Sequence, residues 1–296
     1  MAISLHLFGD ESADETGQRV FAVSGLVGTG REWQLAEDAW VQRTGGQVFH
    51  ATDCETEYAR DSDRNKHKAN LSLYKELTEI LANGYVAGIC MALDLVSFRE
   101  CFPAAPLDAP YFKCLSDLLS AFGNLTREHN AKLENEREFD EVQIDFTVDD
   151  RRQSSHNAGE LYKAFVNQPE WVDRNACLGA KLSFDTRANP RIQMADLVAR
   201  EAMKELDRKL APTRRQPRKS WLALEQSGKF KFQERDRAYC ERSREAMPQL
   251  QAETGMSDER YSRWLAETGR VQNGRPHDTM ANRIEYFALL DRKRGS

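Results

Sequence analysis

The sequence predicts an α/β fold in which a mixed β-sheet is flanked by helices, with a basic, mainly helical region after it. Short apolar, strand-like segments alternate with longer segments of helical periodicity, the order typical of α/β domains. The first two strand-like segments follow each other directly and predict a hairpin, so part of the sheet is antiparallel. The 296 residues, 40% of them hydrophobic, suffice for one large domain or for one domain with an appendage.

The N-terminal elements are predicted from apolar runs and the residues that interrupt them. Residues 4–9 alternate weakly and predict a short strand that stops at Asp10. Residues 20–28 are apolar and predict the second strand, and the polar stretch between the two closes the hairpin. Apolar residues at helical spacing, Trp33 among them, then predict a helix over residues 31–43.

The middle of the chain alternates between strand and helix signals. Residues 45–53 predict a turn, a short strand and a loop. An amphipathic pattern over residues 68–82, closed by Asn83 and Gly84, predicts a helix with a glycine end signal. A strong strand at residues 85–96 follows, and then a helix whose apolar face runs from Tyr111 to Leu125.

The next strand carries the clearest period-2 pattern. Residues 142–148 alternate strictly between apolar and polar side chains, and Asp149 and Asp150 end the strand. Residues 161–165 predict a short helix, and residues 178–184 predict a weak edge strand.

A long helix completes the predicted α/β region. Asn189 as N-cap and Pro190 at the first helical position mark its start, and it ends near Pro212. The rest of the chain has no convincing strand, only helical patches at residues 232–247, 257–268 and 282–292. We therefore divide the chain into an acidic domain, residues 1–206, and a basic, mainly helical extension, residues 207–296.

The charges support this division. The chain has a net charge of −5, yet residues 207–296 carry 20 Lys and Arg against 13 Asp and Glu, an excess of +7 that leaves −12 on residues 1–206. A basic region next to an acidic one can hold a polyanion, so we expect nucleic acid as a partner. The predicted contact residues are Arg214, Arg215, Arg218 and Lys219. The alternative is a linker and helical cap with a solvated charged face.

Three acidic positions stand out as candidates for chemistry. Asp10 and Glu11 end the first predicted strand, and Asp149 and Asp150, with Asp145 further back, end a later one. Each group could instead be a solvated turn or sheet face, where such residues are common. The choice among Asp145, Asp149 and Asp150 stays open.

Asp196 is the sharpest single signal. It lies in the most apolar stretch of the long helix, where a carboxylate is costly to bury unless it is paired or binds metal. The alternative is an ordinary surface ion pair with Arg200, four residues further on. Carboxylates on two strands and a helix would suit Mg²⁺ or Mn²⁺, which prefer oxygen ligands, and two such ions about 4 Å apart can drive phosphodiester chemistry.

His50, in the segment VFHATD, is a candidate proton shuttle near neutral pH, with Asp53 close by in sequence. An isolated histidine can equally be structural. Gln193 shares a helix face with Asp196. The sequence contains no P-loop, no dinucleotide-binding glycine motif and no nucleophile elbow, which argues against those three classes of enzyme.

Taken together, GDES at residues 9–12, FHATD at 49–53, the strand ending in two aspartates and IQMADLVA at 192–199 resemble the family catalogued as domain of unknown function 3800. That family's usual signature is D-E-S-G, then a histidine motif, then a helix with Q-x-A-D. The resemblance spans residues 4–206. It departs at Ala13, where a glycine is usual, and at Phe49, where an acidic residue often precedes the histidine.

The resemblance implies a ribonuclease-H-like fold, related to integrases and other two-metal nucleases. Family members are mainly prokaryotic, and some resemble mobile-element or phage-defence components. The residues that match the family's motifs are Asp10 and Glu11, His50, Asp149 or Asp150, and Gln193 and Asp196.

We therefore expect a metal-dependent nuclease or phosphodiesterase that acts on nucleic acid with Mg²⁺ or Mn²⁺. The expected metal ligands are Asp10, Asp149 or Asp150, and Asp196. Glu11 would be a further ligand or would orient the water. Gln193 would contact the ligand residues, without touching the metal, and so help to position them. One alternative is a non-catalytic subunit that binds nucleic acid or a companion protein; another is a hydrolase of nucleotides with a closed pocket.

No membrane partner is expected, because the sequence has no apolar run long enough to span a bilayer. No signal peptide is recognisable either, so the expected compartment is the cytoplasm. The six cysteines have no zinc-site spacing and are expected to be reduced and mostly buried.

Overall fold

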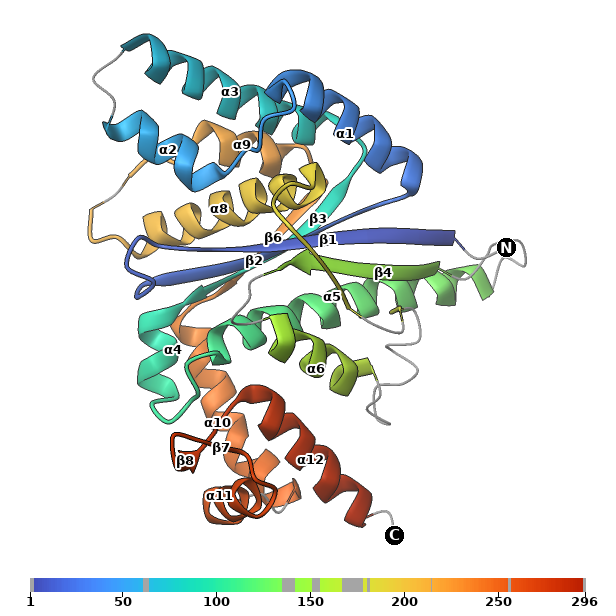
Figure 1. The fold of residues 1–296 in the computed structure, drawn as a ribbon, viewed down its shortest axis with the longest axis vertical. Coiled ribbons are helices and arrows are strands. Elements are labelled where there is room, and N and C mark those ends of the chain that lie inside the picture. Colours follow the sequence, from blue (N-terminus) through green and yellow to red (C-terminus); the bar gives the residue numbers. More distant parts are fainter. Residues whose placement is uncertain are drawn as a thin grey trace.

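A computed structural model describes residues 3–60, 64–134, 142–150, 155–166, 178–179, 182–213, 215–254 and 257–294. Its centre is a six-stranded sheet in the order β5-β4-β1-β2-β3-β6 (Figure 1). The strands are β1 (Ile3–Ala13), β2 (Val20–Gly28), β3 (Ala87–Asp94), β4 (Val142–Asp149), β5 (Ser183–Asp185) and β6 (Phe230–Arg235).

The first three strands form an antiparallel meander, while β4 pairs parallel with β1, β5 with β4 and β6 with β3. This order and these directions are those of a ribonuclease-H-like sheet with β6 added at one edge. The fold class predicted from the sequence is therefore confirmed.

The sequence predicted that the first strand stops at Asp10, and this prediction was wrong. It continues to Ala13, because its antiparallel pairing with β2 runs on through Asp10 opposite Ser24. Its parallel pairing with β4 ends earlier, at Gly9 opposite Val148. Asp10 therefore lies just past the end of the β1–β4 pairing, inside a strand that is still held on its other side.

One layer of helices covers the face of the sheet that carries Phe8 and Ala22 (Figure 1). The long helix α8 (Pro190–Leu210) crosses β1, β2 and β3 and is almost entirely buried. The others are α1 (Gly30–Thr44), α2 (Ala51–Arg60), α3 (Arg64–Asn83) and α9 (Lys219–Gln226). Trp33 and Trp40 of α1, both fully buried, fill the space between these helices and the sheet.

The opposite face carries Leu7, Met91 and Phe146 and packs against α5 (Ala109–Glu134) and α6 (Ser155–Val166). Three more helices extend this side: α4 (Leu95–Cys101), α10 (Arg237–Thr254) and α12 (Met280–Arg294). A small separate core around Tyr261 joins α11 (Asp258–Glu267) to α12, beside a two-residue hairpin, β7 (Val271–Gln272) and β8 (Arg275–Pro276).

Local signals explain where several helices begin. Thr29 and Glu32 form a reciprocal capping box at the start of α1, and Gly45 closes that helix in the left-handed conformation. Asn189 accepts a hydrogen bond from the backbone of Arg191 and caps α8, with proline at its first turn. The predicted start of this helix is confirmed.

Two predictions about elements were wrong. The segment at residues 47–50 forms no strand; it leads directly into α2, which begins at Ala51. The C-terminal region does contain a strand of the main sheet, since β6 pairs with β3 over residues that the sequence assigned partly to a helix. The boundary predicted at residue 206 therefore does not coincide with the edge of the sheet, which includes residues as far as Arg235.

Within the described residues, no helix is long and apolar enough to cross a membrane. The five cysteines among them are free thiols, four of them buried and Cys54 half-buried. Cys177 lies outside the described residues, so nothing is added to its prediction.

Candidate functional site

The centre of the site is the face of the sheet that α8 covers. Side chains alternate along a strand, so Asp10 shares the face of Phe8, which packs in the core beneath α8. By the same alternation Asp149 lies opposite to Val148, whose side chain packs on the α5 side. Both aspartates therefore point toward α8, from adjacent strands, and both are buried, with 1% and 7% of their surface exposed.

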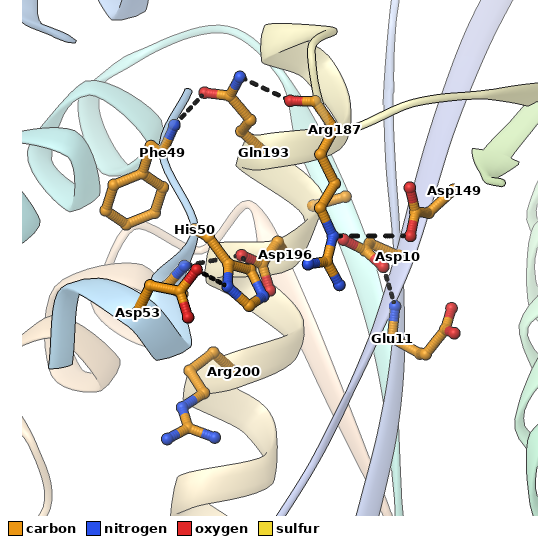
Figure 2. A network of polar contacts seen from close by, with 12 residues as sticks. Asp10, Glu11, Phe49, His50, Asp53, Asp149, Arg187, Gln193, Asp196 and Arg200 are labelled. Atoms are coloured by element: carbon orange, nitrogen blue, oxygen red, sulfur yellow. Dashed lines mark hydrogen bonds and ion pairs between the residues drawn. The ribbon is translucent and has the colours of Figure 1, made fainter. Parts of the chain in front are cut away.

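The third carboxylate comes from α8 itself. Asp196 is 4% exposed and points toward the sheet near Asp10 (Figure 2). The hydroxyl of Ser24 on β2 donates to the backbone oxygen of Ala195 at 2.7 Å, which holds this turn of the helix against the strand next to Asp10. The helix thus delivers Asp196 to the point where the β1–β4 pairing ends.

Asp10 is the least satisfied member of this group. Its Oδ1 accepts a hydrogen bond from the backbone N–H of Glu11 at 2.7 Å, but its buried Oδ2 has no partner among the described residues. Burial raises the pKa of the Asp10 carboxyl well above its usual range, and the charges of Asp196, Glu11 and Asp149 raise it further. The Asp10 carboxylate is therefore close enough to these three side chains to feel their charge.

Asp196 is held by the N-terminus of α2. Its Oδ2 accepts a hydrogen bond from the backbone N–H of Ala51, the first residue of that helix, at 2.7 Å. A carboxylate is stabilised there by the unpaired N–H groups and the helix dipole. Burial nevertheless raises the pKa of Asp196, against the opposing effects of His50, the Ala51 N–H and Arg187.

His50 lies between two carboxylates (Figure 2). Its Nδ1 is 2.8 Å from Oδ2 of Asp53, and its Nε2 is 3.8 Å from Oδ2 of Asp196. Asp53 is exposed, whereas the His50 side chain is 19% exposed. Asp53 therefore lies beside the imidazole on the solvent side without a hydrogen bond to Nδ1, and Nε2 faces the buried acidic group.

Gln193 fastens the two loops that border the site. Its Oε1 accepts hydrogen bonds from Nε1 of Trp40 at 2.9 Å and from the backbone N–H of Phe49 at 3.1 Å. Its Nε2 donates to the backbone oxygen of Arg187 at 2.8 Å. One buried amide thus fixes both the segment that carries His50 and the segment that carries Arg187.

Arg187 brings a positive charge into the acidic group. Its Nε is 3.8 Å from Oδ2 of Asp149, and its guanidinium points into the space between Asp149, Asp10 and Asp196 (Figure 2). No signal in the sequence marked this residue, because it stands in an ordinary polar turn before the cap of α8.

A buried ion-pair network fixes α2 against α8 beside the site. Arg200 donates to Oε2 of Glu55 at 2.9 and 3.0 Å, and Arg218 contacts the other oxygen of the same carboxylate. Arg218 also reaches Glu201 at 3.0 Å, and the hydroxyl of Tyr74 donates to Glu201 at 2.7 Å. Arg200 therefore pairs with α2 and is 3% exposed, rather than forming a surface pair with Asp196.

The remaining acidic candidates lie apart. Glu11 is buried but turns away from Asp196, as expected for the next residue along a strand (Figure 2). Asp145 has a 64% exposed side chain near His6, and Asp150 is exposed beyond the end of β4. Among the three aspartates left open by the sequence, Asp149 is the one that faces Asp10.

The predicted nucleic-acid contacts are spread over different environments. Arg215 and Lys219 are exposed, and the backbone oxygen of Arg215 accepts a hydrogen bond from Arg208. Arg218 is engaged by two carboxylates inside the protein, as described above. Arg214 lies outside the described residues.

No group of three or more His, Cys, Asp or Glu side chains within the described ranges is arranged to hold a metal ion. The chemistry of the group nevertheless suits a hard cation. An unpartnered buried oxygen on Asp10 and the repulsion from its neighbours are what a divalent ion with oxygen ligands relieves.

A cavity of about 960 Å³ opens beside this site, between α2, α3, α8 and α9. Glu55, Arg200 and Arg218 are among its lining residues, whereas Asp10, Asp149 and Asp196 are not. The cavity is therefore large enough for a small molecule but does not present the acidic group to it.

Comparison of the chain with protein-family models and with curated proteins finds no match.

Proposed function

We propose that the protein is a divalent-metal-dependent nuclease or phosphodiesterase that acts on nucleic acid. The observation that carries the proposal is the unpartnered Oδ2 of Asp10, buried beside the carboxylates of Asp149 and Asp196 on a ribonuclease-H-like sheet. Burying three acidic side chains together without a cation lowers the stability of the fold, so such a group points to a ligand of opposite charge.

Asp10, Asp149 and Asp196 would hold Mg²⁺ or Mn²⁺, with Glu11 as a further ligand or as the residue that orients water. When bound, the metal supplies charge stabilisation at a phosphodiester and lowers the pKa of a bound water. Asp10 comes from the sheet and Asp196 from the helix layer above it, and both side chains are buried.

His50 would move a proton within this arrangement. Nδ1 lies 2.8 Å from the Asp53 carboxylate, and Nε2 faces the acidic group. A histidine oriented in this way can take a proton from an attacking water or return one to a leaving oxygen. Gln193 keeps the His50 segment in place through the backbone of Phe49.

The exposed Arg215 and Lys219, with Arg214, would supply sequence-independent contacts to phosphates. The expected relation to the domain of unknown function 3800 family is part of the same proposal. It rests on the motif residues that meet at the site, namely Asp10, His50, Gln193 and Asp196.

A non-catalytic subunit that binds nucleic acid or a companion protein is the second candidate. The guanidinium of Arg187 beside Asp149 favours it, because an internal cation can balance an acidic group that has lost its metal. The small-molecule alternative is less favoured, since the carboxylates do not line the neighbouring cavity.

A cleavage assay tests the proposal. Wild type, Asp10→Asn, Asp196→Asn and the exposed control Asp145→Asn are incubated with labelled DNA and RNA, with Mn²⁺, Mg²⁺ or EDTA. We expect metal-dependent cleavage by wild type and Asp145→Asn and none by the two buried variants. Equal cleavage by all four proteins, or cleavage that survives EDTA, would exclude this site as its source.

A further inference from the structure

Arg187 differs from the other arginines near the sheet in how it meets its carboxylate. Arg191, Arg200 and Arg235 each donate to a carboxylate oxygen at 2.7 to 3.0 Å. Arg187 Nε is 3.8 Å from Asp149, beyond hydrogen-bond distance, and its guanidinium donates no hydrogen bond within the described part of the chain. Its N–H donors are thus available to another acceptor.

The backbone beneath this side chain is fixed. The Gln193 amide holds the backbone oxygen of Arg187 at 2.8 Å. On either side, Asp185 accepts from the backbone N–H of Thr186 and from Nδ2 of Asn189, both at 2.7 Å. The side chain itself is 41% exposed. A firmly anchored backbone therefore carries a loosely held guanidinium.

The partly exposed guanidinium lies beside the acidic group. It is nearest to Asp149, and its charge also acts on Asp196 across the site. Figure 2 shows it directed into the space that these two residues share with Asp10. A planar guanidinium with unused donors matches two oxygens of a phosphate, which a carboxylate-only site would repel.

We propose that Arg187 binds the phosphate of the substrate next to the acidic group, and that Gln193 positions it for this task. The inference rests on the proposed function and adds the residue that recognises the phosphodiester. Without substrate the guanidinium rests against Asp149 and partly balances the acidic charge. With a cation bound to the carboxylates, the same donors serve a phosphate oxygen.

The test separates metal binding from substrate binding. Wild type, Arg187→Gln, Arg187→Lys and the exposed control Arg31→Gln are titrated with Mn²⁺ by calorimetry. Their affinity for a labelled single-stranded oligonucleotide is then measured by fluorescence anisotropy, with Ca²⁺ in place of Mn²⁺ so that binding is read apart from cleavage. Thermal melts confirm that each variant is folded.

We expect Arg187→Gln to bind Mn²⁺ at least as tightly as wild type, since a competing charge is gone. Its oligonucleotide affinity should fall about 10- to 100-fold, as for a lost hydrogen bond to a charged group. The slope of log affinity against log salt concentration should become shallower by the amount expected for about one phosphate contact. Arg187→Lys should be intermediate, because it keeps the charge and loses the fork. Arg31→Gln should match wild type.

Unchanged oligonucleotide affinity in Arg187→Gln, with Mn²⁺ binding intact in wild type, would overturn this inference alone. Loss of Mn²⁺ binding in Arg187→Gln would also overturn it, because the residue would then serve the metal site and not the phosphate. Absence of Mn²⁺ binding in wild type would overturn the proposed function, and this inference with it.

Discussion

Asp10 is the carboxylate of the site whose ionised form is most unfavourable. Its buried Oδ2 has no partner in the described structure, and burial together with Asp196, Glu11 and Asp149 raises its pKa. A carboxyl whose pKa is higher in the folded than in the unfolded protein makes the free energy of unfolding depend on pH. That free energy falls as the pH rises from the unfolded pKa, about 4, through the raised folded pKa. The ionisation of Asp10 should therefore make the metal-free protein less stable at neutral pH than it would be with this carboxyl protonated.

Asp10→Asn should stabilise the metal-free protein at pH 7 by about 1 kcal/mol or more, because a neutral amide replaces the repelled carboxylate. That corresponds to an increase of roughly 2–4 °C in Tm. The gain should vanish below about pH 3, where the carboxyl is protonated in both the folded and the unfolded state. Thermal melts across this pH range, with Asp145→Asn as the matched control, check it; a loss of stability at pH 7 would contradict it.

His50 should matter for proton transfer more than for metal binding. His50→Gln should lower metal-dependent cleavage by about 10²-fold while Mn²⁺ still binds, since its contact to Asp196 is at 3.8 Å. Single-turnover cleavage and calorimetry measure the two effects separately. If the variant cleaves at the wild-type rate with an unchanged pH profile, His50 is structural.

At the scale of elements, α8 and α2 are placed by buried polar contacts as well as by apolar packing. Asp196 receives the N-terminus of α2, and Glu55 on α2 is gripped by Arg200 and Arg218. Burial raises the pKa of Glu55, but the two arginines outweigh burial, so the pKa is lowered overall. The position of His50, which directly precedes α2, therefore depends on ion pairs made by that helix.

Glu55→Gln should destabilise the protein by about 2 kcal/mol, because two largely buried guanidinium groups lose their shared carboxylate. Hydrogen exchange should increase in α2 before the rest of the molecule responds. Denaturant unfolding and exchange measurements, with the exposed Glu259→Gln as control, test this. A variant as stable as wild type would show that apolar packing alone holds α2.

Much of the arrangement of helices and strands could be predicted from the sequence. The strict alternation of β4 and the Asn189–Pro190 start of α8 are local signals, and both were confirmed. β6 was not predictable, because FKFQER is a half-polar edge strand whose partner β3 lies far away in the chain. The pairing of Arg200 with Glu55 instead of Asp196 likewise depends on a contact between distant segments.

The site could be predicted only as a set of acidic positions. The unusual burial of Asp196 was legible from its apolar neighbours, and the choice of Asp149 over Asp145 and Asp150 followed only from strand register. Arg187 gave no signal, because nothing in a short polar turn indicates which way its one long side chain points. Its role depends on the carboxylates that the fold brings together.

The C-terminal region is part of the sheet domain. β6 completes the sheet edge, and Trp221, Leu224 and Phe230 are buried in the core beneath α8. A chain that ends at residue 210 would expose the surface they cover. We expect it to aggregate or to unfold without cooperativity, as judged by gel filtration and thermal melting; a monomer with the wild-type Tm would contradict the description of one core.

We propose that Asp10, Asp149 and Asp196 form one cation site. Calorimetric titration of Mn²⁺ into wild type, Asp196→Asn and Asp145→Asn tests it most directly. Binding by wild type and by Asp145→Asn, and none by Asp196→Asn, is the predicted result, with affinity that weakens as the pH falls and the carboxyls take up protons. No binding by wild type, or equal binding by all three proteins, would contradict the claim.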